Sequence, residues 1–373
     1  MMVYIPGYEG PQVICSIAYC NNETEEILAM GHRALLIEKS RLTIFPDDIS
    51  IVFHDSINEK LLSLEPFDVV EIDNFSILRS LYLNASNSNA LFVGARCNCN
   101  CLMCPYSEAT RRGHAMLPLE RLMEIIDYIP SDAPFITVTG GEPTLLGMEF
   151  LELVRYLNFR LPKTFIQYLT NGRAFANVEF GSLFRDLLRS NNRVAIPVHG
   201  PSAELHDHIT QSPNSFEQTI HGIQLLGSGS AELEVRIVVS KLNYTTMLDI
   251  AKLLVKLSMR ITCVNFMGLE MLGNASKNAS SIWIDYKRAF SYIKPAIDLL
   301  IENKQDVELY NFPLCTVDRE YWGICAKSIS DYKATFAEQC TDCTVREMCG
   351  GFFNSTGRYG KLLIEPVVKK YEI

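Results

Sequence analysis

The chain has 373 residues, of which 48% are hydrophobic and 21% charged, a balance typical of folded globular proteins rather than disordered ones. Its formal net charge of −9, from 34 basic and 43 acidic residues, argues against binding to nucleic acid or anionic membranes through a basic surface. Because no run of 18 apolar residues and no signal-peptide pattern is present, we expect a cytoplasmic protein that does not enter a membrane.

Residues 1–88 are predicted to form a small β-rich N-terminal domain. Its apolar runs have the composition of short strands and are separated by Pro-Gly, Asn-Asn and Pro-Asp-Asp turns; they cover 3–8, 13–19, 34–40, 43–46 and 49–54. Residues 84–89 are small and polar, which predicts a linker.

From residue 90 onwards, apolar runs alternate with amphipathic segments of helical length. The predicted strands are 90–95, 135–139, 164–169, 193–198, 232–240, 262–269 and 307–310. The predicted helices have apolar residues at i, i+3, i+4 and i+7 and cover 117–129, 148–159, 180–190, 215–226, 246–257 and 286–300. This alternation predicts parallel strands joined by crossover helices.

The fold class predicted from this pattern is α/β. The spacing of the units fits a partial (β/α)6 TIM-like barrel over residues 89–305, and a doubly wound open sheet is the alternative. Residues 306–373 lose the alternation and are predicted to be a cysteine-rich extension that an inorganic cofactor stabilises.

The twelve cysteines are concentrated in two places, with four at 97–104 and five at 315–349. In a reducing cytoplasm, clustered cysteines are more often metal ligands than disulfides. Cys15, Cys20 and Cys263 stand apart, and we expect them to be small buried hydrophobic residues.

The first group follows the first predicted barrel strand, at the end where barrel active sites assemble. Cys97, Cys101 and Cys104 have the spacing C-x3-C-x2-C, and thiolates suit iron–sulfur clusters or zinc. Three thiolates on a four-iron cluster leave one iron open, as a catalytic metal site requires. A zinc site that also uses Cys99 is the alternative.

A second motif, Gly140-Gly141-Glu142-Pro143, ends the next predicted strand. Two glycines let a ligand approach the backbone closely, and the backbone carbonyls and Glu142 can accept hydrogen bonds from an ammonium group. Taken alone, the motif is equally well explained as an ordinary turn.

Together the two motifs closely resemble the radical S-adenosylmethionine (SAM) superfamily. The resemblance implies that Cys97, Cys101 and Cys104 hold a [4Fe-4S] cluster and that SAM binds its open iron through the methionine amino and carboxylate groups. It implies that the motif 140–143 faces SAM, and that reductive cleavage of SAM gives a 5′-deoxyadenosyl radical that abstracts hydrogen from a substrate. Met103 stands where the family often has an aromatic residue, and Cys99 has no family role.

Three further residues are predicted SAM contacts. Asn171 ends the third barrel strand in a Thr-Asn-Gly turn similar to one that the family often carries near SAM, and His199 ends the fourth. Arg236 lies in the fifth strand, where it could meet the carboxylate of SAM; a surface or strand-edge arginine is the alternative.

The second cysteine group contains the pattern C-x2-C-x5-C followed by Gly-Gly, which resembles the extensions of radical SAM peptide maturases. A fourth cysteine three residues after Cys349 would mark the long form with two extra clusters, but position 353 is Phe. The shorter, twitch-like form implies one auxiliary [4Fe-4S] cluster, with Cys315, Cys340, Cys343 and Cys349 as ligands. Cys325 in place of Cys315 and a zinc site on the same thiolates remain open.

More specifically, the stretches Cys-Asn-Cys-Asn-Cys-Leu-Met-Cys-Pro and Cys-Gly-Gly-Phe-Phe-Asn resemble the His-Xaa-Ser system radical SAM maturases, which are associated with ribosomally made peptides. This implies a post-translational modification of a precursor peptide, an electron donor such as a ferredoxin or flavodoxin, and possible cooperation with a partner maturase. The N-terminal domain could dock a leader peptide by strand addition. The alternatives are a radical SAM enzyme of small-molecule or cofactor biosynthesis and a non-catalytic iron–sulfur or zinc protein.

Overall fold

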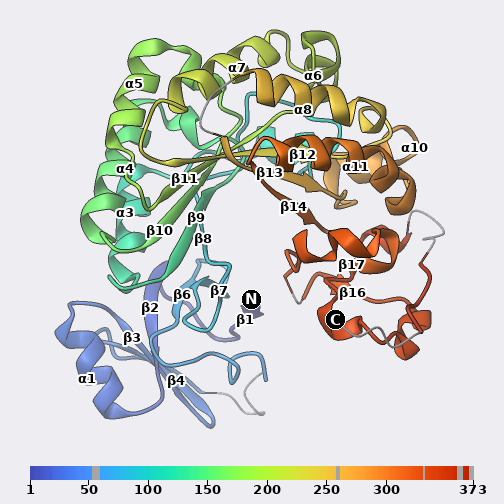
Figure 1. Ribbon diagram of the computed structural model, residues 1–373. Coiled ribbons are helices and arrows are strands. Elements are labelled where there is room, and N and C mark those ends of the chain that lie inside the picture. The colour runs from blue at the N-terminus through green and yellow to red at the C-terminus, as the bar shows by residue number, and fades with distance from the viewer. Residues whose placement is uncertain (53–58, 258–260, 331, 359–363, 369–373) are drawn as a thin grey trace. The chain divides into compact units, whose positions relative to one another are not determined.

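The computed structural model describes residues 1–52, 59–257, 261–330, 332–358 and 364–368. It shows a mixed α/β protein with an N-terminal, mainly antiparallel sheet, an eight-stranded parallel sheet and a cysteine-rich C-terminal segment (Figure 1). Contacts divide the chain into two compact units: Met1–Val93 with Leu117–Val138 and Glu152–Ile166, and Gly94–Met116 with Thr139–Leu151 and Gln167–Ile373. The predicted boundaries at 88/89 and 305/306 stay predictions.

The N-terminal sheet has seven strands in the order β1-β7-β6-β2-β3-β4-β5. The strands are β1 Met2–Tyr4, β2 Val13–Ala18, β3 Ala34–Glu38, β4 Arg41–Phe45, β5 Ile49–Val52, β6 Val69–Ile72 and β7 Ile77–Tyr82, and helix α1 is Asn21–Ala29. All pairs are antiparallel except β2 with β3. Buried aliphatic residues such as Ile17, Leu35 and Ile44 form its core.

Several expectations for this region change. The predicted strand 49–54 ends in positions outside the described residues. The predicted linker closes into a compact turn, because the Asn89 side chain is 7% exposed and binds Leu83 N and O and Ser86 O. Cys20 directly precedes α1 and is exposed, so its predicted burial is wrong, whereas Cys15 is buried as expected.

The eight-stranded sheet has the order β15-β14-β13-β12-β11-β10-β9-β8, an open arrangement in the described residues. Its strands are β8 Ala90–Phe92, β9 Phe135–Thr139, β10 Phe165–Leu169, β11 Asn192–Pro197, β12 Glu232–Val238, β13 Ile261–Met267, β14 Asp306–Tyr310 and β15 Cys325–Ala326. Seven agree with the predicted strands to within a few residues. The two-residue strand β15 was missed because it carries no apolar run that could signal a strand.

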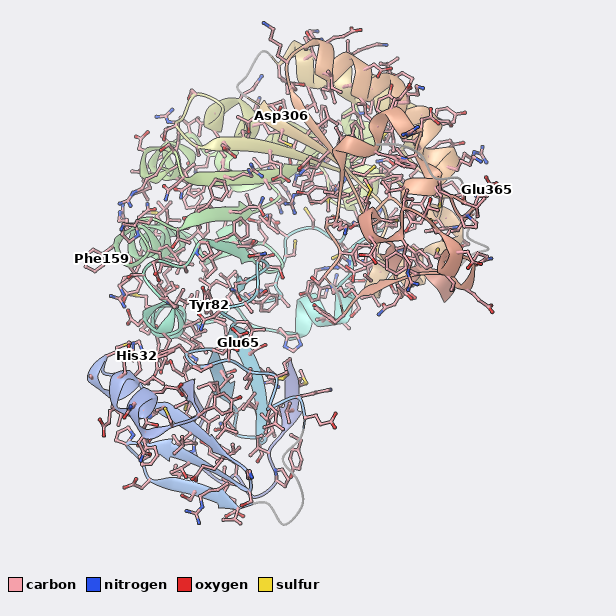
Figure 2. The ribbon with its side chains drawn as sticks, turned by 60° about the horizontal axis from the view of Figure 1, so that its bottom comes forward. His32, Glu65, Tyr82, Phe159, Asp306 and Glu365 are labelled. Atoms are coloured by element: carbon pink, nitrogen blue, oxygen red, sulfur yellow. The ribbon has the colours of Figure 1, made fainter. Side chains whose placement is uncertain are left out.

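Amphipathic helices alternate with these strands. They are α2 Glu108–Gly113, α3 Leu119–Tyr128, α4 Met148–Arg160, α5 Val178–Leu187, α6 Ala203–Thr210, α7 Ser215–Leu226, α8 Met247–Lys256, α9 Gly273–Lys277, α10 Ala279–Ile282 and α11 Tyr286–Glu302. Helices α5, α7, α8 and α11 lie on one face of strands β11 to β14 (Figure 1). Phe159 near the end of α4 is 76% exposed and projects outward (Figure 2). No helix within the described ranges is long and apolar enough to cross a membrane.

The strands present different chemistry to their two faces, and β12 shows this clearly. Leu233, Val235 and Ile237 are buried aliphatic residues, whereas Glu234 and Arg236 alternate with them. Because successive side chains of a strand point to opposite faces, the polar residues share the face opposite the aliphatic ones. Strand β12 therefore places charged side chains on one face of the sheet and aliphatic side chains on the other.

Candidate functional site

The loop 97–104 lies between β8 and α2 and has no regular structure, yet its backbone is held in place. Four hydrogen bonds with later elements hold it. The loop donates through Asn100 N to Thr210 O (3.0 Å) and through Leu102 N to Ile209 O (2.9 Å). It accepts from Asn274 Nδ2 at Cys101 O and from Asn278 Nδ2 at Leu102 O, both at 3.0 Å. Met103 is 7% exposed and packs in an apolar cluster with Ile209 and Leu269. The loop therefore has a defined shape, with Met103 as a core residue.

The four thiols of this loop differ in exposure. Cys97, Cys101 and Cys104 are partly exposed, whereas Cys99 is 6% exposed. Hydrogen bonds from the Cys101 and Cys97 thiols, and then from Arg173, hold the pKa of Cys99 well below its usual value, against the effect of burial. The hydrogen bond to Cys99, followed by burial, raises the pKa of Cys97. The thiols of Cys97 and Cys101 therefore lie within hydrogen-bonding reach of Cys99.

Gly141 lies in the motif that follows β9, and the neighbouring backbone leaves no space for a side chain there. A Cβ atom at Gly141 would lie 2.1 Å from Arg96 O and 2.2 Å from Ala95 O, and its N–H donates to Gly94 O at 2.8 Å. The glycine therefore lets the motif pass directly beside the start of the cysteine loop. The carbonyls of Gly140 and Gly141 accept no hydrogen bond from the described residues and are its available acceptors.

Glu142 carries a fully buried carboxylate, with 0% of the residue exposed. Its Oε1 accepts from Thr144 Oγ1 and Thr170 Oγ1, both at 2.6 Å, and from Thr144 N at 3.1 Å, while Oε2 accepts from Asn171 N at 2.6 Å. Burial raises the pKa of Glu142, and these hydrogen bonds oppose the rise. Because a carboxylate has about four acceptor positions, Glu142 is occupied in joining the turns after β9 and β10.

The turn after β10 joins the cysteine loop to Glu142. Asn171 donates through Nδ2 to Asn98 Oδ1 at 2.6 Å and approaches Cys99 Sγ at 3.7 Å, while its backbone N–H binds Glu142. Arg173 donates through Nη1 to Asn98 O at 2.9 Å and to Cys99 Sγ at 3.3 Å. The structure therefore brings Asn171 together with both predicted motifs. Arg173 was missed, although a charged residue directly after a strand-end turn was a usable signal.

His199 follows β11 and is 4% exposed. Its backbone N–H donates to His206 Nδ1 at 3.1 Å, and its backbone carbonyl accepts from Asn243 Nδ2 at 3.0 Å. The ring Nδ1 of His199 is buried without a hydrogen-bond partner among the described residues. Burial first, and the neighbouring His206 second, lower the pKa of His199 to about 3, against the opposing effect of Cys99. His199 is therefore neutral at pH 7 and has one ring nitrogen available to a ligand.

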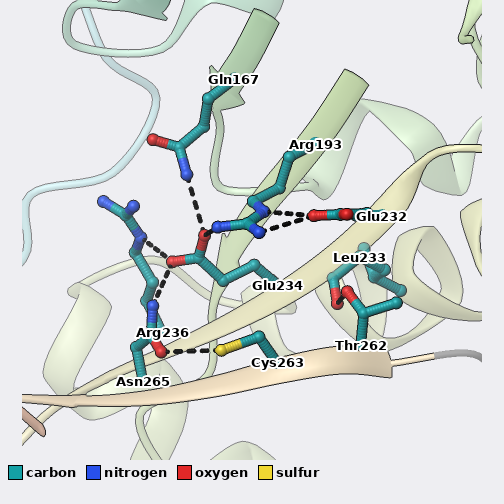
Figure 3. Close-up of polar contacts among 9 residues, drawn as sticks. All are labelled: Gln167, Arg193, Glu232, Leu233, Glu234, Arg236, Thr262, Cys263 and Asn265. Carbon is teal, nitrogen blue, oxygen red and sulfur yellow. Dashed lines mark hydrogen bonds and ion pairs between the residues drawn. The ribbon is translucent and has the colours of Figure 1, made fainter. Parts of the chain in front are cut away.

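A buried polar network crosses four neighbouring strands, with Glu234 at its centre (Figure 3). Glu234 is 0% exposed and accepts from Gln167 Nε2 at 2.9 Å, Asn265 Nδ2 at 2.7 Å and Arg236 Nε at 2.5 Å. Arg193 Nη1 lies 3.6 Å from Glu234 Oε2. The sequence signal that would have found Glu234 was a carboxylate two residues before Arg236 inside an otherwise aliphatic strand.

The guanidinium of Arg236 is fixed through Nε and its terminal nitrogens have no hydrogen-bond partner among the described residues. Figure 3 shows these nitrogens directed away from Glu234. The side chain is 18% exposed, and β12 lies between β11 and β13, so Arg236 is not a strand-edge residue. A fixed guanidinium with a free edge is suited to bidentate binding of a carboxylate.

Four of the five cysteines of the second group line one small cavity. Its lining includes the four predicted ligands Cys315, Cys340, Cys343 and Cys349, together with apolar residues such as Phe336, Val345 and Phe352. Cys325 is not among the lining residues, and its Sγ donates to Tyr321 O at 3.5 Å. Burial raises the pKa of Cys315 to about 11 and that of Cys325 to about 12.

The backbone around Cys349 explains the adjacent Gly-Gly pair. Cys349 Sγ accepts from Leu314 N and Gly351 N, both at 3.4 Å. Gly351 has a φ of 66°, and a Cβ atom there would lie 2.6 Å from Thr335 O. The glycine therefore permits a turn that directs a backbone N–H at the sulfur, an interaction that tunes the reduction potential of iron–sulfur clusters.

The residues present fit iron–sulfur clusters at both places and SAM at the first. A cluster takes each thiolate on a different iron, so its ligands do not converge on one point. No three His, Cys, Asp or Glu side chains among the described residues converge as ligands of a single metal ion. The available carbonyls of Gly140 and Gly141, the open His199 Nδ1 and the free edge of Arg236 complement a zwitterionic ligand.

The fold and site thus define an α/β domain with a cysteine loop at the carboxyl end of its first strand, of the kind that binds an iron–sulfur cluster. Residues 91–269, just under half of the chain, match the family model for the radical SAM superfamily. This segment of the chain is a radical SAM domain.

Curated proteins with known names match a similar part of the chain. An AdoMet-dependent heme synthase of Oleidesulfovibrio alaskensis is 29% identical over 165 residues, which are 43% of this chain and 40% of the relative. A Methanosarcina barkeri protein of the same name is 27% identical, over 43% of this chain and 44% of its own. A cysteine-type anaerobic sulfatase-maturating enzyme of Clostridium novyi is 27% identical, over 40% and 42%. The matches span less than half the length of these relatives.

Solved structures resemble the chain more distantly. Streptococcus suis SuiB bound to its precursor peptide SuiA matches with a TM-score of 0.47 and 12% identity, over 61% of this chain and 49% of SuiB. The protein anSMEcpe with bound AdoMet matches with a TM-score of 0.46 and 18% identity, over 60% of this chain and 61% of its own.

Proposed function

We propose that this chain is a radical SAM enzyme in which Cys97, Cys101 and Cys104 hold a [4Fe-4S] cluster that binds SAM. The bound pair, reduced by a donor such as a ferredoxin or flavodoxin, supplies a 5′-deoxyadenosyl radical that abstracts hydrogen from the substrate. The observation that carries the proposal is the cysteine loop, joined through Asn171 to buried Glu142 at neighbouring strand ends. The family match over residues 91–269 supports it.

The other predicted contacts divide the work of holding SAM. The available carbonyls of Gly140 and Gly141 accept from its ammonium group, while Glu142 and Pro143 fix the turn that presents them. Arg236 binds the carboxylate through its free edge, and His199 offers a neutral ring nitrogen to a polar group of the nucleoside. The buried surroundings of His199 and Glu142 keep water away from the reacting groups.

We further infer that Cys315, Cys340, Cys343 and Cys349 hold one auxiliary [4Fe-4S] cluster. These cysteines line one cavity with apolar walls, and Cys349 also accepts two backbone N–H groups. Cys325 lies outside this lining, which favours Cys315 as the fourth ligand. A full set of four thiolates leaves no position for SAM, so this cluster serves in electron transfer or as a structural element.

For the substrate, the named relatives favour a small molecule of cofactor biosynthesis over the precursor peptide expected from the His-Xaa-Ser resemblance, because two of the three carry the name heme synthase. The peptide is the second candidate, with the sulfatase-maturating relative in its favour. The seven-stranded N-terminal sheet also ends in edge strands β1 and β5, to which an extended peptide could add as a further strand. A possible partner maturase belongs to this second candidate.

The test of SAM cleavage is 5′-deoxyadenosine formation by anaerobically reconstituted protein with dithionite and SAM. Wild type is compared with the triple variant Cys97→Ala/Cys101→Ala/Cys104→Ala and with the control Cys20→Ser, which alters an exposed thiol outside both cysteine groups. We expect product from wild type and the control, and none from the triple variant. Equal product from the triple variant would refute the proposal.

The substrate classes are separated by adding heme precursors in one arm and peptides encoded near this chain's gene in the other. The correct class should raise 5′-deoxyadenosine above the substrate-free rate and gain a mass change in the same reaction. Stimulation in the peptide arm alone would reverse the preference for a small molecule.

A further inference from the structure

Cys99 is the one cysteine of the first group that the proposed function does not use. It is 6% exposed, whereas Cys97, Cys101 and Cys104 are partly exposed. Its sulfur accepts from Arg173 Nη1 at 3.3 Å and lies 3.7 Å from Asn171 Nδ2. Together with Asn98, Cys99 is therefore a point at which the cysteine loop meets the turn after β10.

Arg173 is itself held on three sides. Its Nε donates to Gln218 Oε1 at 2.7 Å, and its Nη1 donates to Ser212 Oγ at 2.7 Å and to Asn98 O at 2.9 Å. A guanidinium fixed in this way is a rigid donor, so the sulfur of Cys99 is held by the scaffold rather than by a mobile side chain.

The same turn also holds Glu142. Asn171 donates its backbone N–H to Glu142 Oε2 at 2.6 Å and its side-chain amide to Asn98 of the cysteine loop, also at 2.6 Å. The residues from 170 to 173 therefore set the position of the cysteine loop relative to the turn 140–143, whose carbonyls are proposed to bind the SAM ammonium group. A misplacement of about 1 Å between two such partners is enough to lower catalysis strongly.

We propose that Cys99 is a positioning residue and not an iron ligand: through Arg173 and Asn171 it anchors the cysteine loop to the turn after β10. It thereby fixes the cluster ligands relative to Glu142. This inference rests on the proposed function, because it assigns the ligand role to Cys97, Cys101 and Cys104.

The test compares Cys99→Ala and Cys99→Ser with wild type after anaerobic reconstitution. Cys101→Ala serves as the variant that lacks a ligand, and Cys20→Ser is the matched control at an exposed cysteine. The measurements are iron and sulfide per chain, SAM affinity, and the EPR signal of the reduced protein with and without SAM. These measurements report on cluster content and on SAM binding without depending on catalytic activity.

We expect Cys99→Ala to keep the iron content of wild type but to bind SAM about tenfold more weakly, since a hydrogen bond to a charged donor is lost. Cys99→Ser should recover most of this affinity, because a hydroxyl oxygen can still accept from Arg173. Cys101→Ala should lose iron. Arg173→Gln should reproduce the loss of affinity, while Arg112→Gln, at a side chain that is 81% exposed, should have no effect.

Two results would overturn the inference. Loss of iron from Cys99→Ala to the level of Cys101→Ala would make Cys99 a ligand, and unchanged SAM affinity in both Cys99→Ala and Arg173→Gln would remove its positioning role. If Cys99→Ala does not fold, Cys99→Val, which also removes the acceptor for Arg173, takes its place in both comparisons. A wild-type protein that carries iron but binds no SAM would refute the proposed function itself, and the inference with it.

Discussion

The two cysteine groups of this chain differ in what surrounds their sulfur atoms. In the loop 97–104, polar side chains and backbone groups from later elements hold the backbone, and the adjoining turns carry a buried carboxylate and an open histidine nitrogen. The second group lines a cavity with apolar walls, and its nearest donors are backbone N–H groups. The first group therefore has polar neighbours that a ligand could meet, whereas four of the five cysteines of the second group face apolar walls.

This difference is relevant to two functions of iron–sulfur clusters, substrate binding and electron transfer. A cluster with three protein ligands and polar neighbours can bind and activate a substrate, while a cluster with four ligands in an apolar shell is closed to it. Changes in the first group should therefore abolish SAM chemistry, and changes in the second should spare SAM binding.

The largest expected effect is that of replacing the first ligand set. The triple variant Cys97→Ala/Cys101→Ala/Cys104→Ala should fall from about eight iron atoms per chain to about four, as one of two four-iron clusters is lost. It should also form no 5′-deoxyadenosine. Iron analysis and product assay check the two parts, and loss of all iron would show that the two groups do not assemble independently.

The corresponding experiment replaces a cysteine of the second group. Cys343→Ala should likewise fall to about four iron atoms per chain, but it should keep SAM binding and substrate-free SAM cleavage within about threefold of wild type. The matched control is Cys325→Ser, at a cysteine outside the cavity lining, which should keep the full iron content. A Cys325→Ser variant that lost iron would move the fourth ligand from Cys315 to Cys325.

The third prediction concerns how Arg236 contributes to SAM binding at the first cysteine group. Arg236→Gln should weaken SAM binding by about 10- to 100-fold, because a hydrogen-bonded charge partner of the carboxylate is lost. Decarboxylated SAM, which lacks that carboxylate, should bind wild type and variant with similar affinity. An equal loss for both ligands, measured by equilibrium binding, would reduce Arg236 to a partner of Glu234.

The smallest effect concerns pH. The pKa of His199 in the folded chain is about 3, below its ordinary value of 6.5, so the stability that depends on its neutral form is complete above pH 6.5. As the pH falls below 6.5 the unfolded chain takes up the proton first, and the free energy of unfolding should fall by about 1.4 kcal/mol per pH unit for each such proton. His206, with a pKa of about 4, adds to this slope.

His199→Gln should lower the dependence of the unfolding free energy on pH by the contribution of one proton, about 1.4 kcal/mol per pH unit. Urea unfolding between pH 7.5 and 5.5 measures it, with His208→Gln at an exposed position as the control. A slope unchanged by His199→Gln would mean that the ring is not buried in its neutral form.

Much of the architecture could be predicted from the sequence because apolar periodicity reports burial directly. Strand β9 has the predicted bounds Phe135–Thr139, and helix α7 has the predicted bounds Ser215–Leu226. In the N-terminal region, strands β6 and β7 and helix α1 were missed. Strand β6 has four residues and α1 lacks a strong apolar face, so local pattern gave little signal and tertiary packing decides their structure.

The candidate site was predictable in its motifs but not in its connections. Spacing identified Cys97, Cys101 and Cys104, whereas the links through Arg173 join residues about 75 positions apart, which no local pattern reports. Gly141 also meets a constraint that the sequence did not reveal, because a Cβ atom there would lie 2.1 Å from Arg96 O. Close approaches between distant segments become visible only in three dimensions.

The central claim is that the first cysteine group alone carries an open iron for SAM. Its most direct test is the EPR spectrum of the reduced Cys343→Ala protein, which isolates the first cluster, recorded with and without saturating SAM. We expect a four-iron signal whose g-values shift when SAM binds. A signal that stays the same while equilibrium binding shows SAM on the protein would contradict it.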